Sequence, residues 1–226
     1  MQTIKEIKKE QELIPIILNN SSIFGRKLLT AEQVCSGYGI ADIVFYNIDN
    51  NFMKKRKLLK IEPIESYDLI QILNYLNKVE EKTISLTFLK EILNPIKNKR
   101  EYIISFLINN GFLIKNSDEN FKMGDKYHIG FKKVIAIEAK LSNWNRGLYQ
   151  AYRYRQFANK SYLALYSKFI HRALANKEEF IKFNVGLIEV ISNSKNGKIK
   201  IHIEPKEEKV QVNVFSAVVF ENLIAI

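Results

Sequence analysis

Apolar and polar positions follow two different periods along the chain. Short segments with apolar residues at alternate positions, or in brief apolar runs, are typical of β-strands. We predict strands over residues 26–34, 40–47, 134–139, 161–166 and 185–191, with a final pair near 198–204 and 210–215. Apolar residues three or four positions apart predict helices over 4–18, 66–78, 85–93, 97–110, 146–159 and 173–183. Pro15 is expected to kink the first of these helices.

The order of the elements predicts an α/β protein that carries an insertion. After residue 134, strands and helices alternate with connections of a length that favours parallel strands. Before it, three predicted helices lead into a small hairpin within 111–123, which is the layout of a winged helix-turn-helix. We therefore predict a discontinuous domain formed by residues 1–57 and 129–226, interrupted by a winged-helix domain of residues 58–128.

Composition excludes several classes of protein. A chain of 226 residues with 46% hydrophobic content can bury a substantial core. No apolar run is long enough to span a bilayer, and the N-terminus lacks the order of a signal peptide, so we expect a cytoplasmic protein with no membrane partner. A single cysteine, Cys35, and three dispersed histidines give no Cys/His zinc spacing. Any metal would therefore be bound by oxygen atoms.

The chain carries excess positive charge, which favours a polyanionic partner, and this excess lies outside the predicted insertion. The chain has 35 Lys and Arg against 24 Asp and Glu, a net charge of +11 that suits nucleic acid, although a Lys-rich composition alone explains it equally well. Residues 58–128 hold ten basic and ten acidic side chains and are neutral. Lys97, Lys99 and Arg100 nevertheless cluster where a recognition helix would enter a major groove. Dimerisation or docking of a partner protein through this domain is the alternative.

The stretch IAIEAK ends a predicted strand with an acid and a base. Residues two apart on a strand point to the same face, so Glu138 and Lys140 are expected to lie side by side. They form either a simple surface pair or part of a site. Asp42, on the predicted strand 40–47, could approach Glu138, and two such carboxylates with a carbonyl and waters suit Mg²⁺.

Three short motifs resemble those of a known nuclease superfamily. GIAD at 39–42, IEAK at 137–140 and QAYRY at 150–154 are similar to the Asp, Glu-x-Lys and Gln-x-x-x-Tyr motifs of the PD-(D/E)xK nucleases. The similarity is greatest to restriction-endonuclease-like enzymes with a Gln helix, and it departs from the superfamily pattern in having Ala41 where a proline is usual. It implies a restriction-endonuclease-like mixed central sheet flanked by helices.

The resemblance also implies roles for individual residues. Asp42 and Glu138 would bind Mg²⁺ or Mn²⁺ together with the Ala139 carbonyl, and Lys140 would serve the attacking water. The implied reaction is hydrolysis of phosphodiester bonds in DNA, which we expect to be double-stranded. A non-catalytic DNA-binding or regulatory module that keeps the nuclease fold is the alternative, and RNA remains open as a substrate.

The predicted helix after Lys140 would carry further site residues. Gln150 and Tyr154 are four positions apart and share a helix face, which the resemblance places against the active strand or the substrate backbone, with Gln150 in the catalytic set. Arg146, Arg153 and Arg155 lie on the same helix and favour phosphate contacts as a group. Taken singly, the tyrosine could equally be a core residue and each arginine a solvated one.

Many members of the superfamily use a glutamate from the first helix as another metal ligand. On a helical wheel Glu10 falls among apolar residues, whereas Glu12 falls on the opposite side. Because a carboxylate in an apolar face is costly unless it is paired or binds metal, we favour Glu10. Glu12 stays open because Pro15 makes the register uncertain, and Glu32 on the predicted strand 26–34 is a further alternative.

Overall fold

The computed structural model describes residues 6–192, 197–210 and 213–225. It divides into two compact units, one formed by the chain up to Asp49 with Phe131–Ile224, and one formed by Asn50–Gly130. The inserted unit therefore begins earlier than the predicted boundary at residue 58, because helix α2 (Asn50–Leu58) belongs to it.

The larger unit is built on a six-stranded sheet with the order β1-β2-β6-β7-β8-β9. The central strands β6, β7 and β8 are parallel, and all other neighbours are antiparallel, so the predicted mixed central sheet is confirmed. The strands are β1 (Leu29–Cys35), β2 (Ile40–Ile48), β6 (Phe131–Lys140), β7 (Lys160–Tyr166), β8 (Gly186–Ile191) and β9 (Lys198–Ile203).

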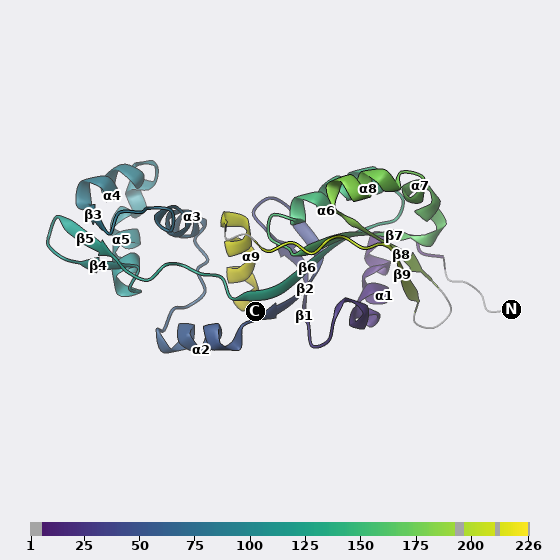
Figure 1. Cartoon of the computed structure of the whole chain (residues 1–226), viewed down its shortest axis with the longest axis horizontal. Coiled ribbons are helices and arrows are strands. Elements are labelled where there is room, and N and C mark those ends of the chain that lie inside the picture. The colour runs from purple at the N-terminus through teal and green to yellow at the C-terminus, as the bar shows by residue number, and fades with distance from the viewer. Residues whose placement is uncertain (1–5, 193–196, 211–212, 226) are drawn as a thin grey trace. The chain divides into compact units, whose positions relative to one another are not determined.

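Helices cover both faces of this sheet. Figure 1 shows α1 (Ile14–Asn19) on one side and α6 (Trp144–Tyr154), α7 (Ile170–Leu174) and α8 (Lys177–Phe183) on the other. Helix α9 (Val214–Ile224) packs on the second side, over β1, β2 and the start of β6. The short helical turns η1 (Glu10–Glu12), η2 (Ser21–Phe24) and η4 (Ser167–Phe169) complete this unit.

Strand β6 explains why the sheet needs cover on both faces. Ile135, Ile137 and Ala139 pack in the cluster that contains α1, whereas Val134 and Ala136 pack in the cluster that contains α9. A strand buried on both faces reads as a continuous apolar run, as the sequence from 134 to 139 does. Glu138 is the single charged residue in that run, and its burial therefore demands a specific partner.

The pairing of β2 with β6 fixes where the insertion leaves the sheet. Ile48 faces Phe131 at one end of the pair, and Ile43 faces Ile137 toward the other. One further step of an antiparallel register brings Asp42 opposite Glu138. The inserted unit thus joins these strands at the end remote from both acids.

The inserted unit has a helix, strand, helix, helix, strand, strand order after α2. Its small sheet has the order β3-β5-β4. Its elements are α2, α3 (Tyr67–Leu76), β3 (Thr83–Ser85), α4 (Leu86–Ile92), η3 (Asn94–Lys99), α5 (Arg100–Asn109), β4 (Leu113–Lys115) and β5 (Asn120–Met123). A core of its own holds it together, with Leu73, Leu89, Leu93, Ile103 and Leu107 almost fully buried.

Some predicted elements were wrong. Residues 6–9 are not helical, and Pro15 lies in the first turn of α1, where its missing N–H is tolerated, rather than in a kink; Ile4 lies outside the described residues. The predicted strand 210–215 was also wrong where it can be compared, because Val214 begins α9; residues 211–212 lie outside the described chain. This helix is apolar on nearly every side, so its sequence lacks the polar stripe that marks a surface helix.

None of the helices in the described segments is long and apolar enough to cross a bilayer.

Candidate active site

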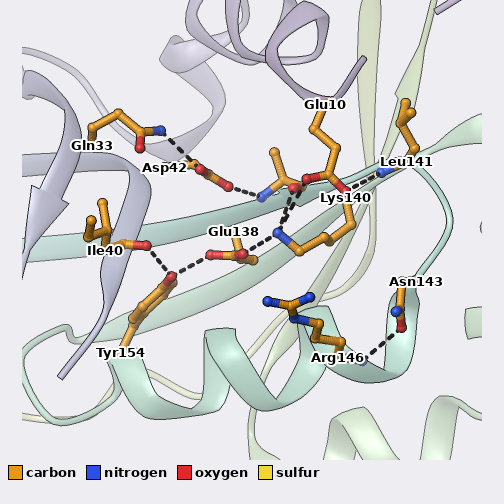
Figure 2. A network of polar contacts seen from close by, with 11 residues as sticks. Glu10, Gln33, Ile40, Asp42, Glu138, Lys140, Leu141, Asn143, Arg146 and Tyr154 are labelled. Atoms are coloured by element: carbon orange, nitrogen blue, oxygen red, sulfur yellow. Dashed lines mark hydrogen bonds and ion pairs between the residues drawn. The ribbon is translucent and has the colours of Figure 1, made fainter. Parts of the chain in front are cut away.

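Glu138 and Lys140 form a buried ion pair at the end of β6. The Lys140 Nζ lies 2.5 Å from Oε1 of Glu138 and 3.3 Å from the carbonyl oxygen of Ala139 (Figure 2). The two side chains are 2% and 12% exposed, so this is no solvated surface pair. The i and i+2 spacing on a strand puts both on one face, as the sequence predicted.

Tyr154 completes the surroundings of Glu138. Its hydroxyl donates to Oε2 of Glu138 and also lies 2.6 Å from the carbonyl oxygen of Ile40, so a single proton faces two acceptors. The ring is 2% exposed, so of the placements that the sequence left open for Tyr154, against the active strand or in contact with the nucleic-acid backbone, the structure shows the first. Tyr154 therefore orients the Glu138 carboxylate, and because its ring is buried it exposes no ring face to a substrate.

Asp42 meets Glu138 from the neighbouring strand. Its Oδ2 accepts a hydrogen bond of 2.8 Å from the backbone N–H of Ala139, and its Oδ1 accepts one of 3.0 Å from the Gln33 side chain. Gln33 was not singled out by sequence reasoning. What distinguishes Gln33 is a left-handed backbone conformation within β1, with φ 52°, and no sequence pattern reveals such a conformation.

Glu10 brings a third acidic segment to the site. Its Oε2 lies 3.5 Å from Nζ of Lys140, and its Oε1 accepts a hydrogen bond of 3.4 Å from the Leu141 N–H. Glu12 instead accepts from the backbone of Lys8 and Lys9. Glu10 reaches the site from the start of η1 and not from the apolar face of a helix, so it was the acid we favoured, for a reason that the structure does not support.

Burial and charge set the protonation of this cluster. Burial raises the pKa of Glu138, although hydrogen bonds from Lys140 and Tyr154 oppose the shift. Burial lowers the pKa of Lys140, but the adjacent Glu138, with smaller contributions from Glu10 and Asp42, outweighs it and leaves the pKa above its usual value. Lys140 is therefore an ammonium at neutral pH.

The oxygen atoms around Lys140 are those that Mg²⁺ prefers. They are carboxylate oxygens of Glu10 and Glu138 and the carbonyl of Ala139, with the Asp42 carboxylate bound to the Ala139 amide beside them. A cleft of about 430 Å³ opens onto Glu10, Asp42 and Ala139. The donor chemistry thus fits a divalent cation. In the structure the positive charge beside these oxygens is the Lys140 ammonium. Within the described residues no group of three or more His, Cys, Asp or Glu side chains lies close enough to hold a metal ion in this arrangement.

The other predicted residues of α6 lie at different distances from this centre. Gln150 is half-buried, and its side-chain oxygen accepts no hydrogen bond within the described part of the chain. Arg146 and Arg153 are exposed and line an open hollow with Gln150. Arg155 is instead engaged within the protein, because it donates to the carbonyl of Phe183 at 2.8 Å and to Glu208 at 2.5 Å.

The basic cluster of the inserted unit is largely paired. Lys99 forms an ion pair of 2.7 Å with Asp68, and Arg100 donates to the carbonyl of Lys90 at 3.4 Å, whereas Lys97 is exposed. The exposed residues of helix α5 are Glu101, Tyr102, Ser105 and Asn109, which carry no positive charge.

No protein-family model matches this chain, and no curated protein and no solved structure shows significant similarity to it.

Proposed function

We propose that this protein is a metal-dependent nuclease that hydrolyses phosphodiester bonds of DNA, on a restriction-endonuclease-like fold. One observation carries the proposal. Acidic side chains from three separate segments, Glu10, Asp42 and Glu138, gather with Lys140 around the Ala139 amide and carbonyl groups. A buried acid within an otherwise apolar strand costs stability, which a purely structural sheet would avoid.

The carboxylates of Asp42, Glu138 and Glu10 and the carbonyl of Ala139 would hold Mg²⁺ or Mn²⁺. When bound, such an ion neutralises charge on the phosphate and lowers the pKa of a bound water. Tyr154 holds the Glu138 carboxylate in orientation through its hydroxyl. Lys140, protonated because its pKa is raised, donates hydrogen bonds and stabilises negative charge that develops on the phosphate.

The exposed arginines of α6 supply the contacts to the DNA backbone. Arg146 and Arg153 lie beside the catalytic strand, and within the described residues neither forms an ion pair with a carboxylate. Arginine donors of this kind bind phosphate without reading sequence. Arg155 contributes less to DNA binding, because its charge is already neutralised by Glu208.

The order of elements in the inserted unit supports a winged helix-turn-helix. Its α5 helix occupies the position of a recognition helix. The exposed face of α5 holds Glu101 and Tyr102 and lacks basic residues, so docking of a partner protein or a second copy suits this face better than reading a major groove.

Cleavage assays with matched variants test the nuclease. Purified protein is incubated with plasmid in Mg²⁺ or Mn²⁺, beside Asp42→Ala, Lys140→Ala and the control Glu12→Ala, whose carboxylate accepts hydrogen bonds from the backbone N–H groups of Lys8 and Lys9. We expect losses of at least about 100-fold for the first two, little change for the control, and no cleavage in EDTA. Equal activity of all four proteins, or cleavage in EDTA, would remove the proposal.

The second candidate is a DNA-binding module without catalysis. It is favoured by one observation: the Lys140 ammonium already balances the charge of Glu138. Calorimetric titration with Mn²⁺ separates the two functions. Binding that is lost in Asp42→Ala supports the nuclease, and absence of binding in the native protein supports the module.

A further inference from the structure

An open hollow lies over α6 beside the candidate active site. It has a volume of about 640 Å³ and contains no carboxylate among its lining residues, which are Asn143, Asn145, Arg146, Tyr149, Gln150 and Arg153. Gly147 lies on the same helix, and a Cβ built on it would fall 2.9 Å from Cγ of Lys140. The first turns of α6 therefore lie against the strand that carries the catalytic pair.

The hollow combines positive charge with an exposed aromatic ring. Figure 2 shows the Arg146 side chain extending from α6 toward the end of β6 that carries Glu138 and Lys140. Tyr149, one helical turn further on, is 48% exposed. Its ring packs edge to face with Phe183 at 5.6 Å between centroids, which leaves part of it in solvent.

A second aromatic group adjoins the same helix. Tyr38, in the turn between β1 and β2, is 54% exposed, and the guanidinium of Arg153 stacks over its ring at 5.1 Å. A planar guanidinium on an aromatic ring presents a flat surface at the rim of the site.

We propose that this surface, Tyr149 with Arg146 and the stacked Arg153 and Tyr38, binds an unpaired nucleotide next to the scissile phosphate. The preferred DNA substrate then contains a single-stranded segment, in contrast to the double-stranded DNA expected from the sequence. This inference rests on the proposed nuclease function and names its substrate class.

The chemistry of the lining residues supports an unpaired base. In a duplex the faces of the bases are stacked on one another, and only an unstacked base can offer its face to a tyrosine ring. The amides of Asn145 and Gln150 supply both donors and acceptors for base edges. The Gln150 oxygen is buried and accepts no hydrogen bond from the described residues, so a rotation of the side chain into the hollow would let it accept one from an exocyclic amino group.

Binding assays in EDTA separate recognition from cleavage. The probes are a labelled single-stranded DNA oligonucleotide and the same sequence annealed as a blunt duplex. We expect the native protein to bind the single strand at least about ten-fold more tightly, and Tyr149→Leu to lose about ten- to a hundred-fold of that affinity, the effect of removing one stacking ring. Tyr149→Phe, which keeps the ring, should bind as the native protein does.

Two further measurements guard against a folding defect. Tyr75→Leu is the matched control, since Tyr75 is 46% exposed on α3 of the inserted unit, and it should leave binding unchanged. A fluorescent base analogue in the single strand should change its emission on binding to the native protein and not on binding to Tyr149→Leu, because the tyrosine ring replaces a neighbouring base as its stacking partner.

Equal or tighter binding of the duplex, an emission change that is the same in Tyr149→Leu as in the native protein, or equal loss of binding in Tyr149→Leu and Tyr149→Phe would overturn the inference. If duplex plasmid is cut in Mg²⁺ while single strands bind no better than duplex, the nuclease proposal stands and this one fails. If single strands bind through Tyr149 but no DNA is cut, the nuclease proposal fails and the surface is a site that recognises unpaired DNA without cleaving it.

Discussion

Gln33 donates a hydrogen bond of 3.0 Å to Oδ1 of Asp42 from a left-handed backbone conformation with φ 52°. For a residue other than glycine, this left-handed conformation costs about 1–2 kcal/mol of stability. The other oxygen of Asp42 is held by the Ala139 N–H at 2.8 Å. The fold thus maintains a strained residue whose side chain completes the orientation of a candidate metal ligand, an arrangement common at functional sites.

Replacing Gln33 with glycine should separate stability from activity. Gln33→Gly relieves the strain and removes the hydrogen bond, so we expect the free energy of unfolding to rise by up to about 1 kcal/mol while cleavage falls about ten-fold or more. Lys27→Gly is the matched control, since Lys27 is also left-handed, with φ 60°, in the turn before β1. It should raise stability and leave cleavage unchanged. Parallel changes in both variants would contradict a role for Gln33 at Asp42.

Removing the Tyr154 hydroxyl should shift the pH dependence of cleavage. The hydrogen bond from Tyr154 lowers the pKa of Glu138 against the larger effect of burial. In Tyr154→Phe this pKa rises further, so the acid limb of kcat/KM at fixed Mg²⁺ should move to higher pH. Tyr152→Phe, exposed on the same helix, should leave the limb in place.

The same change has a defined sign for stability. A carboxyl group whose folded pKa is raised stabilises the fold below its unfolded pKa and loses that contribution as pH rises through the folded pKa. Tyr154→Phe should therefore lose more stability at neutral pH than at about pH 4, measured by urea unfolding. A loss that is the same at both pH values would indicate that Tyr154 acts on Glu138 only through packing.

A methyl group at Gly147 should push α6 away from the sheet. An added Cβ would lie 2.5 Å from Cδ1 of Leu163 and 2.9 Å from Cγ of Lys140. We expect Gly147→Ala to destabilise the protein by about 1–2 kcal/mol despite the better helix propensity of alanine, and to reduce cleavage. Asn145→Ala, at an exposed position of the same helix, is the control for stability. A stabilised Gly147→Ala protein would show that α6 packs less tightly here.

The Arg155 and Glu208 pair should stabilise the fold only above acidic pH. A hydrogen bond from Arg155, followed by one from Asn184, lowers the pKa of Glu208, so its contribution is present above the unfolded pKa and is lost as pH falls through the folded pKa. Because Glu208 is 45% exposed, Glu208→Gln should cost only about 0.5 kcal/mol at neutral pH, and progressively less as the pH falls through the folded pKa of Glu208. Glu207→Gln, whose nearest ammonium is 3.9 Å away, should have a smaller effect.

The sequence located the acids of the site because strand periodicity is a local property. Glu138 and Lys140 had to share a face once the strand was recognised, and that holds in the structure. The convergence of Asp42 on the same strand end depended on which strands pair, which the motif order suggested and periodicity alone could not. The parallel pairing of β6, β7 and β8 followed from the alternation of strands and helices, whereas the mixed character of the sheet was what the resemblance implied.

Features that depend on tertiary packing could not be predicted from the sequence. The conformation of Gln33 is imposed by the sheet around it, and the position of α6 over β6 decides between the buried and the substrate-facing placements that the sequence left open for Tyr154. Helix α9 was mistaken for a strand at its start because burial favours apolar residues in either type of element. Helix α2 was missed because its basic residues give no apolar face to the pattern.

The junction of the inserted unit has a consequence for how such a protein can change over time. Ile48 and Phe131 face each other across two paired strands, so their chain ends can be bridged by a tight turn as readily as by a whole module. The acids lie toward the other end of those strands. Modules can therefore be exchanged or lost at this position during evolution without changing the strand ends that carry the acids, and the same position offers protein engineers a graft point.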